Sequence, residues 1–211
     1  MKHSVNNVEE RIYSFLMCAM PLLALVVFAA LFFVHAGYGM FRSRSWGFSI
    51  PNKAGWVIME APAFIVMLCL WLNSNVRFEI PEFIFFLLFE IHYFQRSFVF
   101  PILMRGKSRM PISIILMGLV FNIINGFLLA MGLFYLAPQG KYDETWVERP
   151  IFWIGVLLFI AGMLINIHSD HAIRTLRQPG DTRHYLPQKG MYKWVTSGNY
   201  FGELLEWIGF A

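Results

Sequence analysis

The stretch IYSFLMCAMPLLALVVFAALFFV, residues 12–34, decides the fold class because it contains no charged residue. It is long enough to cross a bilayer core of about 30 Å, which takes roughly 20 apolar residues in a helix. A signal peptide would have a shorter apolar region, a basic start and a small-residue cleavage site, whereas Glu9 and Glu10 precede this run. We therefore predict a retained transmembrane helix.

The composition of the whole chain agrees with a membrane protein. Of its 211 residues 57% are hydrophobic and only 14% are charged, whereas about a quarter of the residues in a soluble domain are charged. Further apolar stretches cover residues 54–72, 83–104, 111–137 and 151–168, and a last one opens near Tyr200. We predict an all-α, polytopic membrane helix bundle, with residues 1–211 forming one domain because the connections are short.

Lysine and arginine are distributed unevenly between the two sides of the predicted spans. If each span is a helix, five of the 17 fall on one side, eleven fall on the other, and Arg96 lies inside a span. The side richer in these residues usually faces the cytosol, so we expect the N-terminus outside. The membrane would be the endoplasmic reticulum in a eukaryote or the inner membrane in a bacterium.

One acidic residue, Glu60, lies within the second span, in GWVIMEAPAF. A charge at the bilayer centre costs about 2.5 to 3.5 kcal/mol on insertion scales, so an intramembrane acid is a candidate functional residue. Pro62 lacks an N–H and clashes with the carbonyl of Ile58, which predicts a kink beside the carboxyl group. The alternative is that Glu60 reaches the interface or pairs with an arginine, and only holds helices together.

The third span carries a dense group of polar residues in FEIHYFQRSFVF. Glu90, His92, Tyr93, Gln95 and Arg96 together predict a wet or ligand-filled cavity, because a helix that only packs in a membrane does not need them. Tyr93 can donate its phenolic proton to a carbonyl oxygen. For Arg96 a structural pair with Glu90 remains open.

The fifth span runs directly into the polar sequence NIHSDHAIRTLRQPGD, residues 166–181. At 100° per residue Asn166, Asp170, Ile173 and Arg177 fall within about 60° of one another on a helix. They form a polar stripe with one apolar member. Arginine in such a stripe can bind phosphate with two parallel hydrogen bonds.

A second stripe follows on the last helix, where Asn199, Glu203 and Glu206 again fall within about 60°. Two stripes of amides, carboxylates and an arginine suit a ligand with hydroxyl, amide and phosphate groups. The alternative is a solvated cytosolic helix end. That explains Arg174 well but explains the two acids Glu203 and Glu206 in an apolar helix poorly.

Several other site types are not indicated. His168 and His171 are spaced as a metal pair could be, but with six histidines in all we expect no metal site. The sequence GYGMFR has two glycines of a dinucleotide fingerprint without the third or a preceding strand. Basic residues are spread over short loops, so we expect no nucleic-acid binding.

Taken together, GWVIMEAPAF, HYFQRSFVF, RGK, NIHSDHAIRTLRQPGD and SGNYFGELLEWIGFA resemble the steroid 5α-reductase family. The resemblance runs from about residue 37 to residue 211, and the last third is its most specific part. The family is a bundle of seven membrane helices that uses NADPH to reduce the Δ4 double bond of 3-oxo steroids. About six spans are present here, so we expect the family's last helix and C-terminal tail to be missing.

The resemblance assigns roles to residues of this chain. Glu60 and Tyr93 match the pair that holds the 3-keto oxygen of the steroid. The expected cofactor contacts are Asn166, Asp170, Arg177, Asn199, Glu203, Arg96, Arg105, Lys107, His184 and Tyr185. The expected lining of the steroid slot is Trp56, Phe121 and Phe210. His168 and His171 become supports rather than metal ligands, and the cofactor site is expected to face the cytosol.

These roles imply a mechanism. Hydride adds to the β-carbon of a conjugated enone, and negative charge grows on the carbonyl oxygen. Two hydrogen-bond donors in a dry site stabilise that charge selectively in the transition state. Tyr93 is one donor, and Glu60 is the other when it is protonated, the form that burial favours. The protein would be an oxidoreductase acting on CH–CH groups.

Other functions remain open. A reductase of trans-2-enoyl thioesters in lipid elongation would use related chemistry on an acyl carrier. A methyltransferase of the isoprenylcysteine type would bind S-adenosylmethionine, but it does not need Glu60 beside Tyr93. A transporter with Glu60 and Arg96 as coupling charges is disfavoured by the lack of internal repeats. The expected partners are a steroid or other enone lipid and membrane lipid, and the chain is expected to be a monomer.

Overall fold

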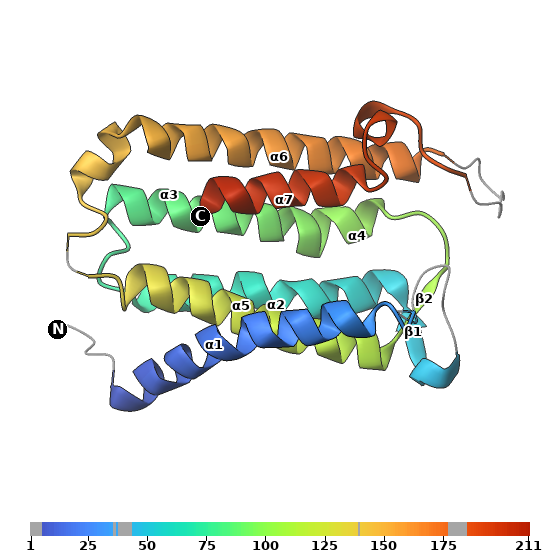
Figure 1. Ribbon diagram of the computed structural model, residues 1–211, viewed down its shortest axis with the longest axis horizontal. Coiled ribbons are helices and arrows are strands. Elements are labelled where there is room, and N and C mark those ends of the chain that lie inside the picture. Colours follow the sequence, from blue (N-terminus) through green and yellow to red (C-terminus); the bar gives the residue numbers. More distant parts are fainter. Residues whose placement is uncertain (1–5, 36, 38–43, 139, 177–184) are drawn as a thin grey trace. The chain divides into compact units, whose positions relative to one another are not determined.

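The computed structural model describes residues 6–35, 37, 44–138, 140–176 and 185–211, and nearly all of them belong to helices (Figure 1). The chain divides into two compact units, Met1–Lys141 and Tyr142–Ala211. The helices of the first unit are α1 (Asn7–Ala30), α2 (Asn52–Asn73), α3 (Ile80–Phe94), α4 (Phe100–Leu103) and α5 (Ile112–Phe134). Those of the second unit are α6 (Pro150–Arg174) and α7 (Gly198–Phe210).

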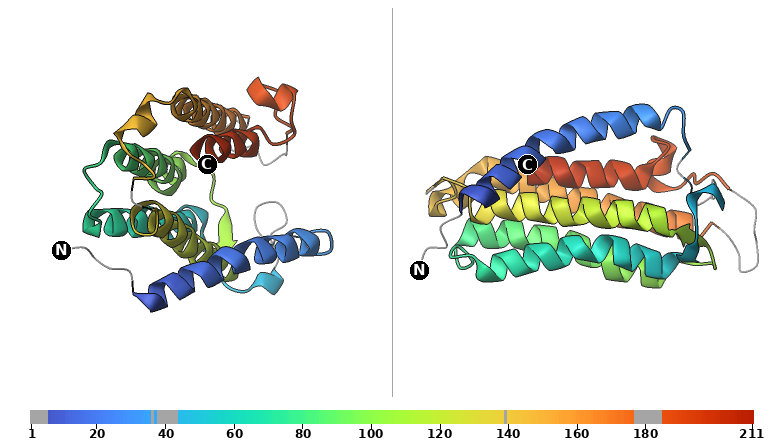
Figure 2. Two further views of the ribbon diagram at one scale, coloured as in Figure 1. Left: turned by 60° about the vertical axis from the view of Figure 1, so that its left-hand side comes forward. Right: turned by 90° about the horizontal axis from the view of Figure 1, so that it is seen from below.

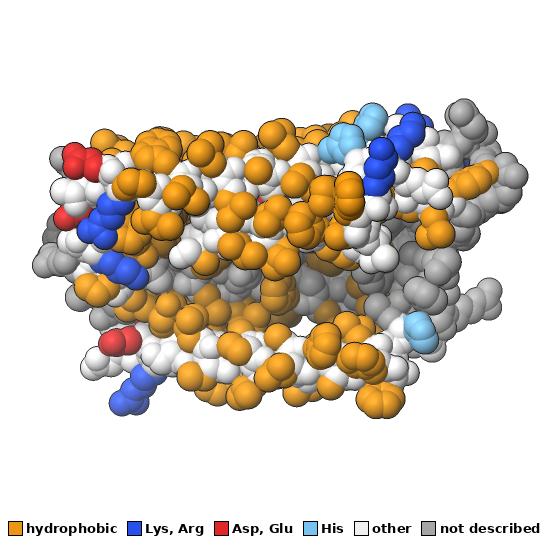
Figure 3. Space-filling model, turned by 45° about the horizontal axis from the view of Figure 1, so that its top comes forward, with side chains coloured by type: hydrophobic (Ala, Val, Ile, Leu, Met, Phe, Trp, Pro, Cys, Tyr) orange, Lys and Arg blue, Asp and Glu red, His pale blue; other side chains and the backbone are white. Residues whose placement is uncertain are grey.

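Five helical segments among the described residues are long and apolar enough to cross a membrane: α1, α2, the continuous run Ile80–Leu103, α5 and α6. On the face drawn in Figure 3, hydrophobic side chains cover the lengths of the helices, and charged side chains gather near the helix ends. The chain is a multi-pass membrane protein, as its composition predicts. The remaining helix, α7, has 13 residues. The direction in which the spans cross the membrane stays a prediction.

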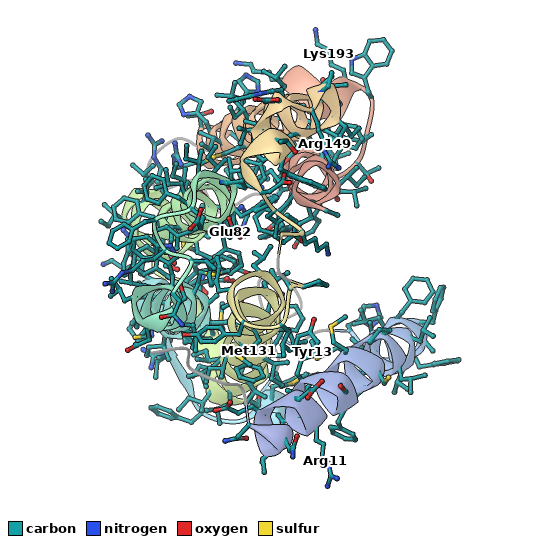
Figure 4. The ribbon with its side chains drawn as sticks, turned by 90° about the vertical axis from the view of Figure 1, so that its left-hand side faces the viewer. Arg11, Tyr13, Glu82, Met131, Arg149 and Lys193 are labelled. Carbon is teal, nitrogen blue, oxygen red and sulfur yellow. The ribbon has the colours of Figure 1, made fainter. Side chains whose placement is uncertain are left out.

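The first helix starts before its apolar run because its cap is polar. The side chain of Asn6 accepts hydrogen bonds from the backbone N–H groups of Val8 and Glu9, at 3.0 and 2.9 Å. Glu9 accepts from the N–H of Asn6 in return, which completes a capping box. No residue of α1 is buried. Tyr13 and Met131, labelled in Figure 4, mark where α1 meets α5.

The third span is interrupted by a π-helix, η3 (Gln95–Val99), between α3 and α4. Pro101 has no N–H to donate to the carbonyl of Ser97, and its ring would clash with that carbonyl in a regular α-helix. The backbone adjusts, and the N–H of Phe100 donates to the carbonyl of Gln95, five residues back. Turns of this kind are frequent at functional sites. This one begins two residues after Tyr93.

The all-α prediction omits one small feature. The strands β1 (Ser49–Pro51) and β2 (Arg109–Pro111) pair antiparallel, with Ile50 opposite Met110. Each strand leads directly into a long helix, α2 or α5. The two-stranded ladder therefore aligns the starts of these two helices.

Small residues let α2 and α5 pack closely along their length. A methyl group on Gly126 of α5 would lie 3.0 Å from the carbonyl oxygen of Ala63 on α2. Asn122 lies one turn earlier on α5 and is only 4% exposed. Close backbone approach through small residues is the usual way in which membrane helices associate. Here it brings the amide of Asn122 up to α2.

In the second unit α6 and α7 pack antiparallel through glycines, and they run side by side in both views of Figure 2. Gly155 and Gly162 of α6 meet Gly209 and Gly202 of α7. A methyl group on Gly162 would lie 2.5 Å from the Gly202 carbonyl oxygen. The two backbones are in contact at these points, so the polar residues beside the glycines are held at fixed positions. Three short 3-10 turns, η2 (Arg44–Trp46), η4 (Glu144–Glu148) and η5 (Gly190–Lys193), complete the described chain.

Candidate functional site

The core of the first unit holds Glu60 and Tyr93 on one side of α5. The amide nitrogen of Asn122 donates to the Glu60 carboxylate at 3.3 Å and to the Met59 carbonyl at 2.9 Å. The amide nitrogen of Asn125 donates to the phenol oxygen of Tyr93 at 2.8 Å. Positions three apart lie on the same face of a helix. Neighbouring turns of α5 therefore anchor the two predicted catalytic residues, and we call these four side chains the Glu60–Tyr93 cluster.

Both predicted catalytic residues are groups that can donate a hydrogen bond. A tyrosine hydroxyl that accepts one hydrogen bond still carries a hydrogen that it can donate. Tyr93 is only 5% exposed, so that hydrogen is directed within the protein. Glu60 is half-buried, and in its protonated form it supplies a second donor. Whether Glu60 also pairs with an arginine stays open, and the Asn122 amide is one partner of its carboxyl group.

Asn122 and Asn125 were missed in the sequence. The signal for them is the same as for Glu60: two amides stand in the apolar run LVFNIINGFLL, where an unsatisfied polar group is expensive. Their spacing of three residues places them on one face of a membrane helix. That pattern alone does not reveal which residues of other helices they contact.

Arg96 is 6% exposed and lies against aromatic rings. Its guanidinium carbon lies 5.2 Å from the ring centre of Trp56 and 4.7 Å from that of Phe100. The pair with Glu90 does not form, since neither carboxylate oxygen of Glu90 has a hydrogen-bond partner in the described part of the chain. Cation–π contact stabilises a buried guanidinium by roughly 0.5 to 2 kcal/mol.

The residues predicted to line a steroid slot occupy different surroundings. Trp56 packs on Phe100 with ring centres 5.1 Å apart. Phe121 is 50% exposed on the outer side of α5. Phe210 lies in the second unit, 6.3 Å from the ring of Phe159. Their role in substrate binding stays a prediction.

A basic pocket of about 300 Å³ lies at the start of α2 and β2. Its lining consists of Pro51, Asn52, Lys53, Met104, Arg105, Gly106, Lys107, Ser108 and Arg109. Two of these cations are held by backbone carbonyls. Lys53 donates to the carbonyl of Ile102 at 3.1 Å, and Arg109 donates to the carbonyl of Ser49 at 3.2 Å. Arg105 and Lys107 are exposed. Four cations beside a helix N-terminus make a site for an anion, and phosphate suits it.

The second unit holds a separate group of polar residues on α6, η5 and α7, which we call the α6–α7 polar cluster: Asn166, Asp170, Tyr192 and Asn199. Asn166 and Asp170 are buried, with 2% and 6% of their surface exposed. The amide nitrogen of Asn166 donates to the Asn199 carbonyl at 3.0 Å, and the Tyr192 hydroxyl donates to the Asn199 side chain at 3.2 Å. The two predicted stripes therefore do meet at Asn166 and Asn199.

Tyr192 is a member of this cluster that the sequence did not indicate. Burial raises the pKa of its hydroxyl above the usual value, the backbone of Asn199 lowers it, and the charge of Asp170 raises it further. The phenol is therefore neutral at physiological pH and acts as a hydrogen-bond donor.

The remaining predicted cofactor contacts are spread out. Glu203 is half-buried on α7, and Tyr185 is 41% exposed. Arg177 and His184 lie outside the described residues. Helix α6 continues to Arg174, as the uninterrupted polar run predicts.

The two histidines at this end of α6 make structural contacts. His168 packs on Gly190, where a methyl group would lie 2.4 Å from its ring. The ring nitrogen Nδ1 of His171 is 3.1 Å from the guanidinium of Arg174. Both contacts agree with a supporting role.

Comparison with known proteins now decides the family. The family model described as 3-oxo-5-alpha-steroid 4-dehydrogenase matches residues 108–211. The chain is 37% identical over 205 residues to 3-oxo-5-alpha-steroid 4-dehydrogenase 1 of Homo sapiens, which covers 96% of this chain and 78% of the relative. This chain belongs to the steroid 5α-reductase family.

Other members of the family match over similar lengths. The type 1 protein of Bos taurus is 37% identical over 202 residues, covering 94% of this chain and 76% of the relative. The type 2 protein of Sus scrofa is 37% identical over 193 residues, covering 90% of this chain and 74% of the relative. The resemblance noted in the motifs is thereby confirmed.

Proposed function

We propose that this 5α-reductase family member is a 3-oxo-5α-steroid 4-dehydrogenase, which reduces the Δ4 double bond of a 3-oxo-Δ4-steroid with NADPH. The observation that carries the proposal is the Glu60–Tyr93 cluster, in which two amides of α5 anchor an acid and a phenol inside a membrane-spanning unit. The names of the relatives support the substrate class.

In this proposal the cluster holds the 3-keto oxygen. As the enone accepts hydride at its β-carbon, charge moves to this oxygen, and the hydrogens of Tyr93 and protonated Glu60 stabilise it. Donors of this kind act strongly where water is excluded, and losing one typically costs about 100-fold to 1000-fold in rate. Asn125 keeps the Tyr93 hydroxyl oriented by occupying its acceptor side, and Asn122 does the same for Glu60.

Each unit by itself holds residues whose chemistry suits part of a nicotinamide dinucleotide phosphate. NADPH supplies the hydride when it is bound. The basic pocket offers the cations Arg105, Lys107 and Arg109 to a phosphate group. The α6–α7 polar cluster offers amides, a phenol and the Asp170 carboxylate to hydroxyl and amide groups. Arg96, Arg177, Glu203, His184 and Tyr185 remain proposed contacts of the same cofactor.

The test is a turnover assay on the purified protein in detergent. With NADPH and a Δ4-3-ketosteroid we expect the absorbance of the reduced nicotinamide to fall. The product should be heavier than the steroid substrate by two hydrogen atoms. Tyr93→Phe and Glu60→Gln should each lower the rate by about 100-fold or more, with little change in NADPH affinity. If both variants turned over the steroid as fast as the wild type, the catalytic assignment would be wrong.

The substrate panel separates the alternatives. A 3-oxo steroid that lacks the Δ4 bond should not be reduced. A trans-2-enoyl thioester that is reduced faster than the steroid would instead assign the protein to enoyl-thioester reduction. Methyl transfer from S-adenosylmethionine to an isoprenylcysteine would indicate the methyltransferase alternative.

A further inference from the structure

The third span holds a second buried acid that the proposed mechanism does not use. Glu90 of α3 is only 7% exposed. Neither of its carboxylate oxygens has a hydrogen-bond partner within the described residues, whereas Glu60 is bonded to Asn122. A buried acid without a partner inside a membrane span calls for a ligand, a water molecule or a reacting atom beside it.

The protonation state of Glu90 follows from its surroundings. Leaving a neutral polar group buried and unsatisfied costs about 1 to 3 kcal/mol, and leaving an unpaired charge there costs far more. The side chain is therefore held as a neutral carboxylic acid. In that form it carries one acidic hydrogen that no described group accepts.

The position of Glu90 relates it to Tyr93. The two residues are three apart in a regular part of α3, so they lie on the same helix face, with Cβ atoms roughly 5 to 6 Å apart. Ser97, four residues beyond Tyr93 in η3, is 0% exposed, and its hydroxyl also has no hydrogen-bond partner in the described chain. Unsatisfied polar groups thus precede and follow Tyr93, along the helix face that the Glu60–Tyr93 cluster uses.

The reaction proposed for the cluster needs a proton as well as a hydride. An enone that has received hydride at its β-carbon is an enolate, and its α-carbon must then take up H⁺ to give the saturated ketone. The site lies in a membrane span, where water is scarce. Tyr93 and Glu60 are engaged at the oxygen, and each would lose its function as a hydrogen-bond donor on giving up its proton.

We propose that Glu90 is the acid that protonates the α-carbon, an inference that rests on the proposed reductase function. The enolate electron pair forms the new C–H bond, the O–H bond of Glu90 breaks, and Glu90 is left as a carboxylate. It then takes a proton from water before the next cycle. Each turnover consumes one hydride and one proton.

The substitution that tests this role is Glu90→Gln, which keeps the shape and removes the acidic hydrogen. Glu82→Gln is the matched control, because Glu82, labelled in Figure 4, is also a buried acid on α3. It stands eleven residues before Tyr93, which is about 16 Å along the helix axis. General acid catalysis contributes about 100-fold to 10,000-fold. We expect Glu90→Gln to lower kcat by at least 100-fold with an unchanged KM for NADPH, and Glu82→Gln to leave kcat within about twofold.

Two further readouts separate a proton donor from a structural residue. Glu90→Leu removes an unsatisfied polar group, so the Tm should rise while turnover is lost. A residue that only supports the fold would lower both or neither. In infrared spectra, protonated Glu60 and Glu90 should both contribute carboxyl bands that shift in D₂O. The component lost in Glu90→Gln should persist in Glu82→Gln.

The outcomes distinguish this inference from the function on which it rests. A wild-type protein that reduces no enone would overturn the proposed function, and the donor role with it. An active wild type with an equally active Glu90→Gln variant would overturn the donor role alone. A wild type minus Glu90→Gln difference spectrum that contains no protonated-carboxyl band would show that Glu90 is ionised, which also contradicts the proposal.

Discussion

Gly202 of α7 is a position where adding a single methyl group should change both stability and cofactor binding. In Gly202→Ala the added methyl carbon would lie 2.5 Å from the backbone nitrogen of Asn166 and 2.6 Å from the carbonyl oxygen of Gly162. Ordinary contacts of such a carbon begin at 3.4 Å. The atoms that it meets are backbone, so α6 and α7 must separate by about 0.9 Å, the difference between 2.5 and 3.4 Å.

The separation would act on the α6–α7 polar cluster. The hydrogen bond from Asn166 to the Asn199 carbonyl is 3.0 Å long, and the same displacement would stretch it to about 3.9 Å, too long for a hydrogen bond. Overpacking of this kind costs about 1 to 3 kcal/mol. At about 3 °C per kcal/mol for a chain of this size, Tm should fall by roughly 3 to 9 °C.

Thermal unfolding of the detergent-solubilised protein, followed by tryptophan fluorescence, measures this change. Trp207 on α7 packs on Phe159 of α6 and reports on the contact. The NADPH concentration needed for half-maximal binding should rise at least tenfold. The control is Ala161→Val, which adds methyl groups at an exposed position of α6 and should leave both values unchanged. If Gly202→Ala had the same Tm and NADPH affinity as the wild type, the close contact and its role in holding the cluster would both be refuted.

Three further predictions concern single features of the two units. Replacing Asn125 with Leu removes the hydrogen bond to Tyr93, so kcat in the steroid assay should fall about tenfold with an unchanged KM for NADPH. The double substitution Arg105→Gln and Lys107→Gln removes two cations from the basic pocket, so titrations should show a tenfold or greater loss of NADPH affinity and a smaller loss for NADH. Burial raises the pKa of Tyr192, so the folded state holds that proton more tightly than the unfolded chain, and stability is lost as pH rises above about 10. Tyr192→Phe should therefore flatten the fall of Tm above about pH 10.

The fold class could be predicted from sequence because a membrane span is a local property. Length and apolarity within one stretch settle whether it can cross a bilayer, and this gave the helices at Asn52–Asn73 and Ile112–Phe134 within a few residues. Periodicity also indicated that Asn166 and Asn199 would meet. Each of these residues stands on a polar stripe that helical phase defines within its own segment.

The partners of Glu60 and Tyr93 could not be predicted in the same way. Asn122 lies 62 residues from Glu60, and Asn125 lies 32 residues from Tyr93. Periodicity shows which face of α5 carries the amides but gives no information about the helix that this face meets. Helix contacts in a membrane depend on how closely two backbones approach, and only the assembled structure fixes that distance.

The sequence by itself thus determined that this protein spans a membrane, that it carries acids, amides and phenols at membrane depth, and that its motifs resemble the steroid 5α-reductase family. Tertiary structure alone decided that Glu60 and Tyr93 are held by α5, that Arg96 faces aromatic rings, and that Glu90 has no described partner. The physical reason is that hydropathy and helical phase are properties of one segment, whereas hydrogen bonding and burial are properties of pairs of segments that packing brings together.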